Sequence, residues 1–114
     1  MTEVITDKKE IQGIISEKIK DKILIFSKYY QWGIAQRGIN HERVLEIFSQ
    51  FDKITEIEID KLKYGDIGYE LFYNLSNNTY FSIATCPKEN KLIIIHAVEY
   101  KRNLEKRFKR FNVK

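Results

Sequence analysis

The sequence has few of the residues that make linkers, disulfides or metal clusters. Its 114 residues include one cysteine, Cys86, one proline and five glycines. A single cysteine excludes an internal disulfide and a cysteine-based metal site, and it is typical of a reducing compartment. The scarcity of proline and glycine makes long flexible linkers unexpected. We therefore expect a single domain over residues 1–114, with residues 1–6 flexible.

Long hydrophobic runs are also missing. No uninterrupted apolar run is longer than Leu92–Ile95, which is far too short to span a bilayer. The first ten residues contain no long apolar stretch, so we expect no secretory signal. The sequence therefore predicts a cytoplasmic protein that does not bind membranes.

Several motifs with known chemistry are absent as well. The sequence has no P-loop, no glycine pattern for dinucleotide binding and no His-Glu-x-x-His. No serine or cysteine nucleophile stands near a histidine in the sequence. We therefore predict no cofactor and no metal site.

The positive charge is concentrated at the C-terminal end. Residues 99–114 carry seven positive and two negative side chains, whereas residues 1–98 carry thirteen positive and fourteen negative ones. The net charge of +4 therefore comes entirely from the last part of the chain. Such a basic end favours contact with nucleic acid or another polyanion, and the alternative is an ordinary solvated face.

Apolar spacing and capping residues predict three helices in the first half of the chain. Isoleucines recur at helical spacing over residues 7–24, with Lys and Glu on the other side. A second helix over 27–37 would begin at the cap Ser27 and end at Gly38. Asn40 can then cap a third helix with its own apolar stripe.

The periodicity then changes from helical to alternating. Residues 54–60 alternate apolar and polar side chains, which predicts a half-exposed strand. Residues 69–75 and 79–86 predict two more strands joined by a tight Asn-Asn turn. Residues 92–98 are almost entirely apolar, which favours a central strand covered on both faces.

This order predicts an α+β fold. We expect N-terminal helices, a four-stranded antiparallel meander sheet and a basic amphipathic C-terminal helix over Asn103–Phe111. The helices would pack on one face of the sheet. The opposite face would stay partly open, and a functional site would lie there.

A local motif adds a family resemblance. The segment Arg37-Gly38-Ile39, after a short helix and before a capped one, resembles the opening of small domains in the RelE-like, barnase–EndoU–colicin–RelE ribonuclease group. As an order of elements, the resemblance covers residues 24–110. It implies a toxin-type ribonuclease fold that cleaves or binds RNA, and a protein partner such as an antitoxin. The histidine and the arginine of the family's helix align with Tyr29 and Gly33 here.

Metal-independent RNA cleavage needs groups that move protons and cations that stabilise the pentavalent phosphate. His96, Tyr100 and Arg102 fall on one side of the last predicted strand, and Arg37 ends the second helix. We predict these four as the catalytic residues. The alternatives stay open: His96 and Tyr100 could simply pack in the core, and Arg37 could serve the helix dipole. His41 lies on the apolar stripe of the third helix, which favours packing.

A phosphate-binding surface is predicted at the basic end and on the second helix. The apolar stripe of the C-terminal helix should dock on the domain while its cations face solvent. The second helix places Tyr29 and Trp32 beside cations, and such an arrangement can stack bases. Core or dimer packing is the alternative for these rings. The predicted nucleic-acid-binding residues are Lys101, Lys106, Arg107, Lys109, Arg110 and Tyr29.

Two hypotheses about function follow. The first is a RelE-like toxin-type endoribonuclease, or a degenerate relative that binds RNA. The second is a non-catalytic nucleic-acid- or protein-binding module of viral or plasmid origin that acts as a homodimer. The tyrosine and glycine at positions 29 and 33 favour the second. A flat, apolar open face would indicate a partner interface, and a concave face lined by His96 would favour catalysis.

Overall fold

The computed structural model describes residues 2–105 and 108 of the chain. Six strands, three α-helices and three short helical turns follow one another along these residues. They are β1 (Glu3–Ile5), α1 (Lys8–Ile14), η1 (Ile15–Ile19), β2 (Ile23–Phe26), α2 (Lys28–Arg37), α3 (His41–Phe48), η2 (Phe51–Lys53), β3 (Ile54–Lys61), η3 (Lys63–Gly65), β4 (Ile67–Ser76), β5 (Thr79–Lys88) and β6 (Lys91–Tyr100).

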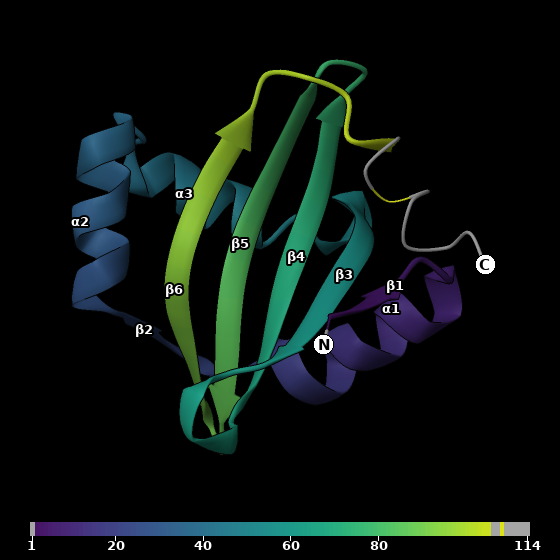
Figure 1. Cartoon of the computed structure of the whole chain (residues 1–114), viewed down its shortest axis with the longest axis vertical. Coiled ribbons are helices and arrows are strands. Elements are labelled where there is room, and N and C mark those ends of the chain that lie inside the picture. Colours follow the sequence, from purple (N-terminus) through teal and green to yellow (C-terminus); the bar gives the residue numbers. More distant parts are fainter. Residues whose placement is uncertain (1, 106–107, 109–114) are drawn as a thin grey trace.

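The strands form one mixed sheet in the order β1-β3-β4-β5-β6-β2 (Figure 1). Strand β2 runs parallel to β6, and every other neighbouring pair is antiparallel. The α+β class is as predicted, but the four-stranded antiparallel meander is wrong. The four predicted strands correspond to β3–β6, and a short strand extends this meander at each edge.

The first two residues of strand β2, Ile23 and Leu24, were predicted to be the end of the first helix. The helix instead widens into the π-helical turn η1 and stops before Asp21, which has a φ of 62°. The next residues pair with β6, where Leu24 lies opposite Leu92. Ile19 and Ile23 are four residues apart, which is helical spacing, although the first ends the helix and the second begins the strand. The spacing therefore predicted a helix that was too long. At the other edge, β1 brings into the sheet residues that were expected to be flexible.

The predicted caps of the second and third helices are confirmed. The Ser27 hydroxyl accepts a hydrogen bond from the Tyr30 amide at 3.0 Å, at the start of α2. Gly38 ends α2 with a φ of 66°, which a glycine adopts without strain. The Asn40 side chain accepts hydrogen bonds from the first amides of α3. Local chemistry therefore determines this helix–turn–helix segment.

One face of the sheet is apolar and packs against the helices. The main core combines residues from all three helices with sheet residues that alternate along each strand. On β4, for example, Leu71 and Tyr73 are fully buried in this core, and the Tyr73 hydroxyl donates a hydrogen bond to the Phe48 carbonyl at 2.8 Å. The expected arrangement of helices on one face and an open opposite face is therefore present.

The part of the chain that follows β6 differs from the prediction. Among the described residues the element order ends with β6 and contains no C-terminal helix, and most of the range predicted for that helix, Asn103–Phe111, lies outside those residues. Leu104 and Phe108 nevertheless pack on the open face against Phe72 and Tyr80. The Phe72 and Phe108 rings meet edge to face, with centroids 4.9 Å apart.

Two burial predictions were also wrong. Strand β6 was expected to be covered on both faces, but its buried residues alternate with partly exposed ones. Strand β3 was expected to be half exposed, but Glu56 and Glu58 are buried on the open side. The hydropathy pattern did not predict the burial of either strand, because coverage of the open face depends on distant segments that include Leu104.

Candidate functional site

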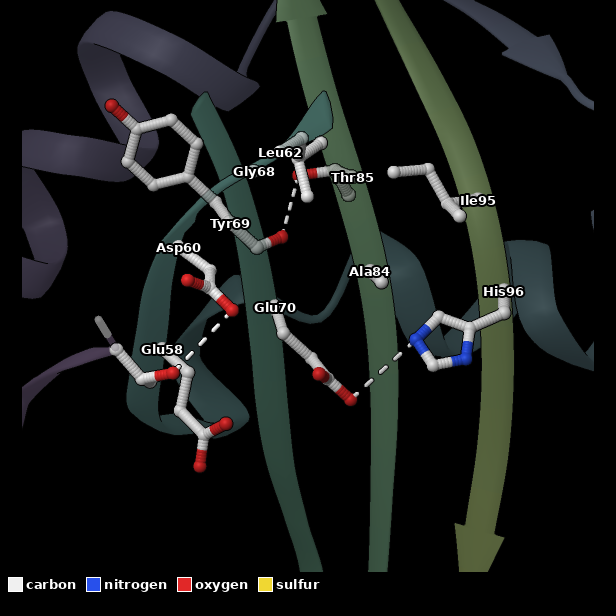
Figure 2. A pocket seen from close by; sticks show the side chains of 11 residues that line it. Glu58, Asp60, Leu62, Gly68, Tyr69, Glu70, Ala84, Thr85, Ile95 and His96 are labelled. Atoms are coloured by element: carbon white, nitrogen blue, oxygen red, sulfur yellow. Dashed lines mark hydrogen bonds and ion pairs between the residues drawn. The ribbon is translucent and has the colours of Figure 1, made fainter. Parts of the chain in front are cut away.

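The open face of the sheet carries a row of polar side chains across three strands. Glu58 of β3 lies opposite Glu70 of β4, which pairs with Ala84 of β5, which in turn pairs with His96 of β6. A β-bulge next to Ala84 leaves Ile95 as an extra residue between the paired positions on β6. Figure 2 shows the resulting arrangement, with the imidazole pointing along the sheet toward the carboxylates.

These residues line a small cavity of about 160 Å³. Its polar walls are Glu58, Asp60, Glu70 and His96, and apolar side chains such as Ile95 complete it. A volume of this size accommodates a few heavy atoms or some water molecules rather than a nucleotide. The cavity is therefore too small to enclose an RNA base and its sugar.

His96 and Glu70 form the central pair of the cavity. The His96 Nε2 atom lies 3.8 Å from a carboxylate oxygen of Glu70. Burial lowers the pKa of His96 below its usual range, the Glu70 carboxylate opposes this shift, and the Arg37 guanidinium adds to it. Since the net shift is downward, the imidazole is mainly neutral at pH 7 and can accept a proton.

The rest of the cavity wall is acidic. Asp60 accepts a hydrogen bond from the Thr2 hydroxyl at 3.4 Å, and Glu58 is buried beside it. Further along β3, burial raises the pKa of Glu56, the Thr55 hydroxyl opposes this by hydrogen bonding, and the Glu105 charge adds to it. Carboxylates at this density repel a phosphodiester anion.

An exposed aromatic pair lies beside this face, on α2. Tyr29 and Trp32 are 56% and 60% exposed, and their ring centroids are 6.3 Å apart. The Tyr29 ring also lies 6.5 Å from the His96 ring. Helix α2 packs along β6, so the pair adjoins the histidine side of the cavity (Figure 1). Two neighbouring rings that face solvent can stack on planar ligand groups.

The four predicted catalytic residues do not share one cavity. Arg37 is close enough to influence His96, but it lines a different groove, together with Lys101. Tyr100 is four residues beyond His96, about 13 Å along an extended strand. It packs 6.5 Å from the Phe72 ring, and the Arg102 guanidinium lies over it at 5.9 Å.

The predicted nucleic-acid-binding residues are only partly described. The Lys101 side chain is exposed and lies 3.6 Å from the Glu99 carboxylate, and Tyr29 is exposed on α2. The other four predicted cations lie outside the described residues. They are Lys106, Arg107, Lys109 and Arg110.

His41 has a packing role. Its Nδ1 atom is 2.8 Å from the Tyr30 hydroxyl, and its ring meets the Phe26 ring edge to face at 4.7 Å. Burial raises the pKa of Tyr30 to about 12, so its hydroxyl stays protonated near neutral pH. The pair therefore holds α2 against the start of α3.

The carboxylates of the open face were not predicted as site residues from the sequence. Glu56, Glu58 and Asp60 alternate on β3, which places them on one side of the strand, and this signal was interpreted only as a solvated face. Glu70 carried no signal of its own, because its position next to His96 depends on the register of β4, β5 and β6.

Two general findings concern ligands and membranes. Within residues 2–105 and 108, no three His, Cys, Asp or Glu side chains come together in a way that would hold a metal ion. In the same part of the chain, no helix is long and apolar enough to cross a membrane.

Comparisons with known proteins found no match to any family model, curated protein or solved structure. The resemblance to the RelE-like ribonuclease group therefore stays a prediction from the sequence.

Proposed function

We propose that this protein binds single-stranded RNA on the surface of α2 and does not cleave it. The observation that carries the proposal is the exposed pair formed by Tyr29 and Trp32. Exposing two large rings side by side is unfavourable in water, so the arrangement favours a ligand that covers them. Bases of a single strand stack on such rings with little dependence on sequence.

Charges on and around α2 support an anionic ligand. Lys28 precedes the aromatic pair and Arg37 follows it on the same helix. Lys101 follows the end of β6, against which α2 packs, and lines a groove together with Arg37. Cations next to stacking rings are the usual composition of a single-strand binding surface. The predicted relation to RNA-acting toxins favours RNA over DNA.

The arrangement of the open face argues against cleavage. Tyr100 and Arg102 are too far along the chain to act on a phosphate held at His96. The cavity next to His96 is lined by Glu58, Asp60 and Glu70. These carboxylates would destabilise the extra negative charge of a pentavalent phosphate, which cleavage requires.

Fluorescence of Trp32 tests the proposal, because this is the only tryptophan in the chain. Titration with a short polyuridylate should quench the emission, since uracil would stack on the indole. Trp32→Ala and Tyr29→Ala should each weaken binding by about 1–3 kcal/mol, measured by anisotropy of a labelled oligonucleotide. Tyr64→Ala is the matched control, because Tyr64 is an almost fully exposed ring on η3. Affinity that is unchanged in both α2 variants would contradict the proposal.

The His96–Glu70 pair supports a second candidate, which is metal-independent RNA cleavage. A mainly neutral imidazole at 3.8 Å from a carboxylate can accept the proton of a ribose 2′-hydroxyl. Labelled RNA incubated with the protein in EDTA would be cleaved, and His96→Gln and Glu70→Gln would abolish the cleavage. Intact RNA after incubation with the unmodified protein excludes this candidate and leaves the binding proposal standing.

A further inference from the structure

A second surface next to α2 has the charge and shape to hold a nucleic-acid backbone. A groove of about 530 Å³ lies where α2 ends, α3 begins and β6 finishes. Its lining includes the cations Arg37, Arg43 and Lys101, and among the described residues Glu99 is its one acidic side chain. It is open to solvent and lies apart from the acidic cavity at His96.

The turn between the two helices positions two of these cations. Gly38 reverses the chain in the left-handed conformation, and the Ile39 amide donates a hydrogen bond to the Ile34 carbonyl at 2.9 Å. The Asn40 side chain then accepts hydrogen bonds from the amides at the start of α3, including that of Arg43. Arg37 and Arg43 therefore project from the two sides of a turn that has little conformational freedom.

Glu99 organises the groove and leaves its cations available. Its side chain is 15% exposed and accepts a hydrogen bond from an Arg43 guanidinium nitrogen at 2.8 Å. Hydrogen bonding from Arg43 lowers the pKa of Glu99, so this carboxylate is charged at neutral pH. Lys101 lies 3.6 Å away and is 82% exposed. Glu99 therefore contacts two of the three cations, and the four side chains together keep a net charge of +2 for a ligand.

Arg43 is further held by an aromatic contact, since its guanidinium lies 5.8 Å from the centre of the buried Phe81 ring. Arg37 is held differently, because it folds back over α2. A Cβ atom at Gly33 would lie only 2.6 Å from a guanidinium nitrogen of Arg37. The glycine thus leaves room for Arg37 between the groove and the aromatic pair.

The groove continues the surface that carries the aromatic pair. Tyr29, Gly33 and Arg37 follow one another at i, i+4 and i+8 along one stripe of α2, and the Arg37 side chain folds back over Gly33 toward the aromatic pair. We infer that the groove binds the sugar–phosphate backbone of the same RNA strand whose bases stack on Tyr29 and Trp32. This inference rests on the proposed function and adds the site and the chemistry, namely phosphodiester oxygens held by Arg37, Arg43 and Lys101.

The salt dependence of binding separates the phosphate contacts of the groove from the stacking of bases on the aromatic pair. Affinity for a labelled polyuridylate is measured over a series of salt concentrations for Arg37→Gln and Lys101→Gln. Each variant should weaken binding several-fold and reduce the slope of log K against log salt by about 0.7, the value for one lost phosphate contact to a single strand. The matched control is Lys9→Gln, which removes an exposed cation from α1 and should leave the slope unchanged.

Glu99→Gln adds a test of opposite sign. The removal of the Glu99 carboxylate from the groove should strengthen binding and leave the Trp32 quenching intact. Thermal melts of all variants confirm that they are folded. Unchanged slopes in both cation variants, with normal Trp32 quenching, would contradict phosphate binding in the groove and leave the proposed stacking on the aromatic pair unaffected. An absence of polyuridylate binding by the unmodified protein would overturn the proposed function itself.

Discussion

The two faces of the sheet are built from the same strands but differ in chemistry, because one carries the main apolar core and the other combines polar side chains with a smaller apolar cluster. On the helix side, Leu71 of β4 and Ile83 of β5 are fully buried in a continuous apolar core. On the open side, the same two strands present Glu70 and Ser82. Because side chains alternate along a strand, each strand contributes to both faces. The comparison indicates that stability resides mainly in one face, and that the other is available for polar chemistry.

The largest expected effect is on the apolar face. Leu71→Ala removes a fully buried side chain and should lower the free energy of unfolding by about 2–5 kcal/mol, measured by urea denaturation. Ile67→Ala is the control on the same strand, because Ile67 is exposed and its truncation should cost less than about 1 kcal/mol. Ile67 lies on the same side of β4 but outside the core, so similar costs at both positions would contradict the location of the core at Leu71.

Two buried hydroxyls on β5 sharpen the comparison. Within the described residues, the Ser82 hydroxyl has no hydrogen-bond partner, whereas the Thr85 hydroxyl donates to the Tyr69 carbonyl at 2.8 Å. Ser82→Ala should therefore stabilise the protein by about 1 kcal/mol, and Thr85→Val should destabilise it by about the same amount. Chemical denaturation of the two variants measures both. If Ser82→Ala destabilises the protein and Thr85→Val stabilises it, the hydrogen bonding described for the two hydroxyls is contradicted.

Glu56 makes the open face sensitive to pH. Its pKa is raised in the folded protein, mainly by burial, so the folded state binds more protons than the unfolded state above pH 4.5. The contribution of Glu56 to stability should therefore increase as the pH falls from 7 toward 4.5. Glu56→Gln should raise the melting temperature at pH 7 and remove this increase. A melting temperature of Glu56→Gln below that of the parent at pH 7 would instead show that the ionised Glu56 carboxylate stabilises the folded protein.

His96 should act in the opposite direction, with a smaller effect. Its pKa is lowered in the folded protein, so the unfolded state binds more protons as the pH falls through 6.5. Stability should decline over that range, and His96→Gln should make the decline smaller. Glu70→Gln should enlarge it, because Glu70 partly offsets the lowering of the His96 pKa. Melting temperatures between pH 7.5 and 5.5, relative to that of the parent, measure both effects.

The smallest expected effect concerns ligand binding. Glu70→Gln removes one negative charge next to the aromatic surface of α2 and should raise affinity for polyuridylate by about twofold at low salt. The effect should vanish at high salt, where charges are screened. A loss of affinity would mean that Glu70 takes part in binding the ligand.

Local signals in the sequence were sufficient to predict part of the fold. Ser27, Gly38 and Asn40 predicted the boundaries of α2 and α3, because capping involves atoms only a few residues apart. The four strands of the meander followed from alternation over residues 54–60, from the Asn-Asn turn between the next two strands, and from the apolar run over residues 92–98. The edge strands β1 and β2 escaped detection, since segments of three or four residues show no periodicity of their own.

The candidate site was less predictable. His96 and Arg37 were identified from residue type and position, and they do lie near each other. Glu70 reaches His96 only through the register across β5, and a bulge at Ile95 changes that register. Tyr100 and Arg102 were grouped with His96 because side chains alternate along a strand, but distance along the strand separates them from His96.

The sequence by itself determined the α+β class, the helix caps, the hairpin and the concentration of positive charge at the C-terminal end. Each of these depends on neighbouring residues or on composition. Only the tertiary structure decided that β2 runs parallel to β6, that buried carboxylates face His96, and that Arg37 and Arg43 share a groove. These features depend on contacts between segments far apart in the chain, whose pairing is chosen by the packing of the whole sheet and not by any local preference.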